Sequence, residues 1–492
     1  MKSLLLVLLS AATASAALRA GAAKADITDY QAGPVNDPAF VKVLALDDGS
    51  TRSLLITVDA VSLGEIGYID NGYLGRIRAA MERELGVPGR NVIVNASHCH
   101  HVVRKDADVL TIAAARQAWG HLTEVRAGAG RGREERIMEN RRMRLKNGAE
   151  TDVRRAYAMP RDEDVVEAGP TDPDIGLLRL DRLDGTPLAV IYNFAAHPIH
   201  GVPSGANTAD YPAFASKAIE ENLGPDVLAF FIQGCAGDIN PAKYKDVHTP
   251  HDAEPLGNLL GLAALRALRG IRTEAVSSMD VRNVTLDLPR AADYAARISA
   301  LRAKREQLME SLTGTSLNFK TFSALLVQYG LGGAYPSYYS HRYLHEKSAG
   351  REELKRMDAD NRAEMERYLR NIETMEELTR LQTNLALLEK HQKESAGRKT
   401  LTVEVSGLRI GGFRLVTFPG ELTVEIGLRL KKQLRGFAFV AGYTNGYIYY
   451  TPTAAQRRNA GYAQEDCDSL VAPEWEGIFE RRALEVFRSL GE

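Results

Sequence analysis

The sequence predicts an α/β fold in which a mixed β-sheet is flanked by helices and carries a long inserted α-helical hairpin. From about residue 18 to 285, short β-branched runs alternate with amphipathic segments and with Gly or Pro turns. This alternation is typical of α/β domains. From about residue 290 to 398 the chain is instead rich in Ala, Leu, Glu, Lys and Arg, and the β pattern then returns. We therefore expect one domain over residues 17–492 that contains a helical insertion.

The elements on either side of the insertion have clear local signals. Residues 52–58 and 91–95 have the apolar, β-branched character of strands, and residues 73–84 between them have helical periodicity. After the insertion, LTVEVSGLRIGGFRLVTF predicts two strands joined by a turn at Gly411 and Gly412. A further strand is expected in FAFVAGYTNGYIYYT, and a last helix from about Pro473.

The insertion predicts long amphipathic helices. Apolar residues recur there at three- and four-residue steps, namely Met365, Tyr368, Ile372, Met375, Leu378, Leu385 and Leu388. A stretch rich in Gly and Tyr, at about residues 332–343, separates this helix from an earlier one. Three interpretations remain open: a hairpin leaning on the domain with an ordinary loop at its tip, a cap over a site, or a surface for homo-oligomer formation.

Composition excludes several classes of protein. The 492 residues are 45% hydrophobic and 25% charged, which is ordinary for a globular chain. The 62 Lys and Arg residues nearly balance the 63 Asp and Glu residues, for a formal net charge of -1. Such a chain has no global field to attract nucleic acid or an anionic membrane, so we expect neither as a partner.

The N-terminal residues predict export. Lys2 precedes an apolar run from Leu4 to Leu9, and small residues follow up to Ala16. This order is that of a signal peptide, with cleavage expected after Ala16. No later stretch reaches the roughly 20 apolar residues of a transmembrane segment. We expect a secreted or periplasmic protein.

Three cysteines, Cys99, Cys235 and Cys467, are too few for the disulfide framework of a small secreted domain. Cys99 is a poor candidate for a disulfide because it lies between two histidines on a predicted strand. Whether Cys235 and Cys467 pair is left open by the sequence.

The first candidate site residues follow a predicted strand in NVIVNASHCHH. If the strand continues, side chains alternate, so His98 and His100 share one face. Two imidazoles so placed can bind one metal, or one can bind it while the other acts beside it. A chance cluster of histidines is the competing interpretation.

A second histidine pair repeats this pattern. His197 and His200 follow the apolar run of LAVIYNFAAHPIHG, and ligands in α/β proteins collect at strand ends. Asp210 either accepts a proton from an imidazole or caps the helix that starts near Pro212, and capping is the favoured role.

The turn QGCAGDINP follows another apolar run and contains Asp238 and Asn240. Its small residues suit a close backbone approach to a ligand, and ordinary turn chemistry explains them nearly as well. The turn contains no serine, so no serine nucleophile is proposed there. Cys235 has no evident base nearby, which favours a buried structural thiol.

These segments, taken in order, resemble the neutral ceramidases, secreted zinc amidases that cleave the N-acyl bond of ceramide. The resemblance runs from about residue 19 to 480 and rests on GAAKADIT, SHCHH, NFAAHPIHG, GCAGDINP, FPGELTVEIG and NGYIYY. It implies a catalytic domain of the neutral ceramidase type.

The resemblance implies a zinc site and an active site. Its metal ligands would be His98, His197, Glu421 and Tyr450, with Tyr450 rather than Tyr447 as the phenol ligand. The other active-site residues would be His100, Arg141 and Tyr462, although the adjacent Arg142 competes for the role of Arg141. Where the family carries an active-site serine, this chain has Asn240.

The chemistry of this residue set is that of a hydrolase. Two imidazoles, a carboxylate and a phenol would leave zinc room for a water molecule and let the metal polarise a carbonyl. His100 could move the proton, and Arg141 or Tyr462 could stabilise the oxyanion. An amide is not a nucleophile, so with Asn240 at this position a mechanism through a covalent serine intermediate is excluded there. Attack by metal-activated water remains possible.

We expect an exported zinc-dependent hydrolase that acts on an amide or ester bond of a small or lipid-like substrate other than ceramide. The alternative is a non-catalytic, metal-containing binding protein on the same fold.

Overall fold

The computed structural model describes residues 17–153, 160–330, 338–395, 397–459 and 463–491. The chain forms two compact units. The larger one contains the described residues up to Ala292 and those from Ser395 onward, and the smaller one is Asp293–Glu394. Within the described residues, no helix combines the length and the apolar character needed to cross a membrane. The expected signal peptide, residues 1–16, lies outside the described residues.

A large mixed sheet forms the centre of the larger unit. Among the described residues it has nine strands, in the order β12-β11-β10-β5-β1-β2-β3-β4, with β14 beside β5. Most neighbouring strands are antiparallel, but β3 and β4 are parallel, as are β11 and β12. The strands are β1 (Arg19–Asp26), β2 (Phe40–Asp47), β3 (Arg52–Val58), β4 (Val92–Ala96), β5 (Thr123–Arg133), β10 (Asp174–Arg182), β11 (Pro187–Phe194), β12 (Leu228–Gln233) and β14 (Glu274–Ala275).

Both faces of this sheet are buried, and the alternation of side chains decides what each face contacts. In β2, Val41 and Val43 pack in one apolar cluster with α1 (Tyr73–Leu85) and α2 (Ala107–Gly120). Leu44 and Leu46 of the same strand lie in another cluster, with side chains of a second sheet. Because successive side chains point to opposite faces, a strand that is apolar throughout fits a sheet covered on both sides.

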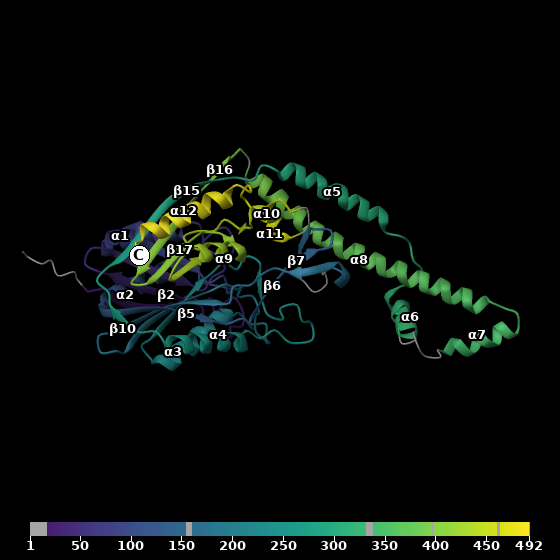
Figure 1. Ribbon diagram of the computed structural model, residues 1–492, viewed down its shortest axis with the longest axis horizontal. Helices are drawn as coiled ribbons and strands as arrows, with labels where there is room; N and C mark the ends of the chain where they lie inside the picture. The colour runs from purple at the N-terminus through teal and green to yellow at the C-terminus, as the bar shows by residue number, and fades with distance from the viewer. Residues whose placement is uncertain (1–16, 154–159, 331–337, 396, 460–462, 492) are drawn as a thin grey trace, which may run out of the picture. The chain divides into compact units, whose positions relative to one another are not determined.

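Helices α3 (Asp210–Leu223) and α4 (Ala253–Leu268) cover the β10–β12 part of the same sheet. They lie next to each other in Figure 1. Gly257 and Gly261 of α4 let the two helices approach closely, since a Cβ at Gly257 would lie 2.5 Å from the Tyr211 carbonyl oxygen.

A second sheet packs on the other face of the first one. Its order is β15 (Met279–Pro289), β16 (Thr400–Ile410), β17 (Phe413–Thr417) and β19 (Phe437–Ala441). Helices α9 (Val424–Gln433) and α12 (Trp475–Ser489) pack on its outer side (Figure 1). The predicted two-residue turn is confirmed, because Ile410 pairs with Phe413 and Gly411 has a φ of 54°. The larger unit is thus layered helix, sheet, sheet, helix, which confirms the predicted α/β class.

Short elements surround the ends of these strands. They are η1 (Gly89–Asn91), β6 (Met138–Asn140), β7 (Arg142–Leu145), β8 (Glu150–Asp152), η3 (Asp162–Asp164), β9 (Val165–Ala168), β13 (Ile239–Pro241), β18 (Glu421–Leu422), β20 (Tyr450–Thr451), α10 (Ala454–Arg457) and α11 (Gln464–Cys467).

The smaller unit is helical, as the insertion predicts. It contains α5 (Tyr294–Ser311), α6 (Phe319–Gly330), α7 (Tyr338–Ser348) and the 42-residue α8 (Glu353–Glu394). Met365, Leu385 and Leu388 of the predicted apolar stripe are buried, whereas Met375 is 60% exposed. The part of the predicted Gly- and Tyr-rich stretch at residues 331–337 lies outside the described residues.

Candidate metal centre

Three candidate ligands come from the carboxyl ends of strands. His98 follows β4 by two residues, His197 follows β11 by three, and Glu421 opens β18 four residues after β17 ends. Each of these strands has a parallel neighbour, and the carboxyl ends of parallel strands are where ligands bind in α/β sheets.

Asn95, at the end of β4, joins these strand ends. Its side-chain oxygen accepts a hydrogen bond from the Gln233 amide at 2.9 Å, and its nitrogen donates to the Gly442 carbonyl at 2.8 Å. Gln233 ends β12 and Gly442 follows β19. One buried carboxamide therefore ties strands of both sheets together next to His98.

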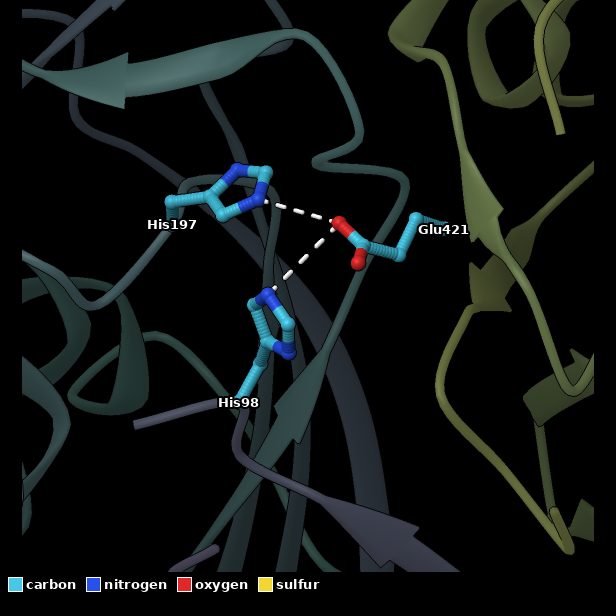
Figure 2. Close-up of side chains that lie close together, drawn as sticks. All are labelled: His98, His197 and Glu421. Atoms are coloured by element: carbon cyan, nitrogen blue, oxygen red, sulfur yellow. Dashed lines mark hydrogen bonds and ion pairs between the residues drawn. The ribbon is translucent and has the colours of Figure 1, made fainter. Parts of the chain in front are cut away.

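The three ligand atoms converge on one point (Figure 2). Nε2 of His98 lies 3.5 Å and Nε2 of His197 lies 3.1 Å from Oε2 of Glu421. The side chains are 3%, 2% and 1% exposed, and their ligand atoms all lie within 4.8 Å of one another. This buried group can hold a metal ion.

Hydrogen bonds on the far side of each ring determine its tautomer. Nδ1 of His98 lies 2.6 Å from the Val61 carbonyl oxygen, and Nδ1 of His197 lies 3.0 Å from that of Ile239. A carbonyl only accepts, so each ring carries a proton on Nδ1. Burial lowers the pKa of His98 to about 4, against the raising effect of Glu421, so that ring is neutral at pH 7 with its Nε2 lone pair free.

Glu421 is held in its charged form. Burial opposes its ionisation, but the His98 and His197 imidazoles and the Tyr447 hydroxyl outweigh burial and place the pKa of its carboxyl well below the usual range. The Nε2 lone pair of His98 therefore faces a carboxylate oxygen inside the protein, and Nε2 of His197 lies within hydrogen-bond distance of the same oxygen. The His98 lone pair and the carboxylate oxygen repel each other unless a cation or a proton lies between them.

Two tyrosines hold this carboxylate: Tyr443, which the sequence interpretation missed, and Tyr447, which it set aside in favour of Tyr450. The Tyr447 hydroxyl donates to Oε1 of Glu421, and the Tyr443 hydroxyl donates to Oε2 at 3.1 Å. The Tyr443 ring also lies 4.4 Å from the His98 ring. Both belong to the segment GYTNGYIYY, whose several tyrosines were the available signal.

Tyr450 lies beside the centre. It is the register partner of Glu421 in the parallel pair of β18 and β20. Its ring stacks on His197, with centroids 6.5 Å apart. The guanidinium carbon of Arg141 lies 5.5 Å from the centre of the same ring.

The expectation that the strand continues through His98 and His100 is wrong. Strand β4 ends at Ala96, and His98 has a φ of 68°, which is uncommon for a residue other than glycine. The chain is held in this turn because the His98 amide donates to the Ala60 carbonyl while its ring donates to that of Val61. His100 is exposed, with its ring 5.6 Å from the His98 ring.

Arg141, rather than Arg142, lies next to the centre. Its Nε donates to Glu465 at 2.7 Å, its Nη1 to Oδ1 of Asn240 at 3.3 Å, and its Nη2 to the Gly237 carbonyl. Arg142 instead pairs with Glu150, Glu465 and Asp466. Burial opposes the charge on Arg141, but Glu465 raises the pKa of its guanidinium well above the usual value.

The GCAGDINP turn makes a close backbone approach, but to the Glu421 segment. A Cβ at Gly237 would lie 2.6 Å from the Glu421 carbonyl oxygen, so no larger residue fits there. Oδ1 of Asp238 accepts from the Val424 amide at 2.8 Å, at the start of α9. The turn thus fixes the backbone that carries Glu421.

The sequence matches no family model and no curated protein. Two solved structures resemble the chain over most of its length. A neutral ceramidase from Pseudomonas aeruginosa has a TM-score of 0.59 at 16% identity, covering 96% of this chain and 74% of that chain. A ceramidase complexed with C2 has a TM-score of 0.60 at 17% identity, covering 96% and 76%. The fold is ceramidase-like.

Other predicted residues of this ceramidase-like fold are placed as follows. Asp210 accepts hydrogen bonds from the Gly201 and Tyr211 amides, so it ties the loop after His197 to the start of α3. The Nδ1 proton of His197 is donated to the Ile239 carbonyl and not to Asp210. His200 stacks on His251 with centroids 5.0 Å apart. Tyr462 lies outside the described residues. Cys99 and Cys235 are buried free thiols, so Cys235 does not form a bridge to Cys467.

Proposed function

We propose that this protein is an exported zinc-dependent hydrolase that cleaves an amide or ester bond. The observation that carries the proposal is the convergence of two imidazole nitrogens and one carboxylate oxygen inside the protein. An uncompensated arrangement of this kind is costly, and cation binding removes the cost.

The donor set fits zinc. Imidazole nitrogen and carboxylate oxygen are zinc ligands, and catalytic zinc sites use three protein ligands with a position left open. We assign Tyr450 as a further ligand, which its position beside Glu421 supports. Bound zinc would polarise a substrate carbonyl and lower the pKa of water to about 7.

The surrounding side chains supply the remaining functions of a hydrolase. His100 is the exposed imidazole next to His98, so it can take a proton from the attacking water and give it to the leaving group. Asn240 stands where the ceramidases that the sequence resembles carry serine, and a carboxamide cannot form an acyl-enzyme. We therefore propose direct attack by water and a substrate other than ceramide. Tyr462 remains a proposed active-site residue on the resemblance alone.

Export is part of the proposal and rests on residues 1–16. These residues have the order of a cleaved signal peptide: Lys2 comes first, an apolar run follows, and small residues end before Ala17. A protein delivered in this way would act outside the cytoplasm.

The metal content of the purified protein tests the proposal. We expect stoichiometric zinc in wild-type protein prepared without chelators, and loss of that zinc in His98→Ala and His197→Ala. His248→Ala is the matched control, since His248 is exposed, and it should keep the metal. Wild-type protein without zinc would refute the proposal. Zinc without turnover on a panel of amides and esters would instead favour a non-catalytic metal-binding protein.

A further inference from the structure

In the side chain of Asn240, the carboxamide oxygen makes a hydrogen bond and the carboxamide nitrogen makes none. It is 1% exposed, and its Oδ1 accepts from Nη1 of Arg141 at 3.3 Å. Its Nδ2 is buried and has no hydrogen-bond partner. Leaving a buried donor without a partner is unfavourable, so this nitrogen is a group that a bound molecule would satisfy.

The orientation of this carboxamide follows from its neighbour. A guanidinium has donors and no acceptor, so only the oxygen of Asn240 can face Arg141. Exchanging nitrogen and oxygen would place N–H groups of both side chains against each other. The group without a hydrogen-bond partner is therefore the NH₂ group, which is a donor.

Arg141 is already committed to the protein. Its Nε, Nη1 and Nη2 donate to Glu465, Asn240 and Gly237, and its guanidinium also interacts with the Tyr450 phenol. A guanidinium held on all three nitrogens in this way has little freedom to reorient toward a substrate. It is better suited to position its neighbours than to bind the reacting oxygen.

Asn240 is linked to the metal centre through its neighbours. It follows Ile239, whose carbonyl accepts the ring proton of His197. Through Arg141 it is linked to Tyr450, whose ring stacks on His197. These links connect the side chain that carries the unused donor to the His197 side of the metal centre.

We infer that the Nδ2 group of Asn240, and not Arg141, donates a hydrogen bond to the acyl oxygen of the substrate, with Arg141 as a positioning residue. The inference rests on the proposed hydrolase function. When water adds to the carbonyl carbon, the π electron pair moves to the acyl oxygen, and a hydrogen bond from Asn240 stabilises that charge. The C–N or C–O bond then breaks, and the leaving group takes a proton. The substrate class is thus one with an acyl oxygen at the scissile bond.

Asn240→Ala and Asn240→Asp separate this role from a purely structural one. Asp keeps an acceptor for Arg141 but has no donor, whereas Ala removes both. Asn222→Ala is the control, because Asn222 is an exposed helical residue. We expect zinc content equal to wild type in all variants. On the best ester or amide of a panel, we expect kcat to fall by about 100-fold in both Asn240 variants, while KM changes by less than about threefold.

Acetohydroxamate, a carbonyl compound that binds zinc, provides a readout without turnover. Its Kd for the zinc-loaded protein should rise by about tenfold in Asn240→Ala and Asn240→Asp, in keeping with the loss of one hydrogen bond. If Asn240→Asp binds the probe and turns over substrate like wild type, Asn240 only holds Arg141 and the inference is wrong. If wild type contains no zinc, the proposed function itself fails, and the inference fails with it.

Discussion

Replacing Tyr447 with phenylalanine removes one hydroxyl from the candidate metal centre and leaves the three ligands in place. That hydroxyl donates to Oε1 of Glu421, whereas both imidazoles approach Oε2. A hydrogen bond to a charged group contributes about 1.5–3 kcal/mol. Since about 1.4 kcal/mol corresponds to a tenfold change in an equilibrium constant, the variant should bind zinc about 10- to 100-fold more weakly.

The same estimate follows from the behaviour of residues that support metal ligands, whose loss costs roughly 10- to 100-fold in affinity. The measurement is a titration of metal-free protein with zinc, in competition with a chromophoric chelator. Tyr68→Phe is the matched control, because Tyr68 is 54% exposed. A Tyr447→Phe affinity within about threefold of wild type, or an equal loss in Tyr68→Phe, would refute the reasoning.

Two further predictions concern stability and assembly. Burial raises the pKa of Asp210 from 3.8 to about 7. The folded state therefore holds this proton more tightly than the unfolded state, which stabilises the fold fully below pH 3.8. This stabilisation is lost as the pH rises to about 7, and the total loss is on the order of 4 kcal/mol. Urea denaturation of metal-free protein at pH values across this window should therefore show a smaller decrease in the free energy of unfolding in Asp210→Asn than in wild type. If the free energy of unfolding depends on pH equally in both proteins, the raised pKa of Asp210 is wrong. Nη1 of Arg290 lies 3.1 Å from Oγ of Ser395, and Pro289 pairs with Thr400 where β15 and β16 lie side by side. The two ends of the insertion are therefore close, and residues 293–394 can be replaced by a short linker. If the insertion mediates self-association, light scattering should show a drop from oligomer to monomer with zinc content unchanged, and a monomeric wild type would contradict it.

Local signals in the sequence were sufficient for most of the fold. The strand at residues 52–58, the helix from Tyr73 and the turn at Gly411 and Gly412 all appear where the sequence predicts them. Each depends on neighbours within a few residues, through side-chain alternation, helical periodicity or glycine in a tight turn. His98 and His197 could also be singled out, because each follows an apolar strand, whereas Glu421 was named only through the resemblance to the neutral ceramidases.

The details of the site depend on contacts between distant segments. The turn at His98 is held by Val61 and Ala60, so the sequence around His98 alone suggested a continuing strand. Arg141 and Arg142 are equivalent by sequence, and only the pairing of β6 with β13 places Arg141 beside Asn240.

By itself, the sequence determined the α/β class and the helical insertion, because periodicity is a local property, and its resemblance to the neutral ceramidases named the three candidate ligands. Only the tertiary structure decided that Tyr447 and Tyr443 hold Glu421 and that the ring protons of both histidines go to backbone carbonyls. Hydrogen bonds have narrow limits of distance and angle, and those limits are met only after strands from both ends of the chain have packed together.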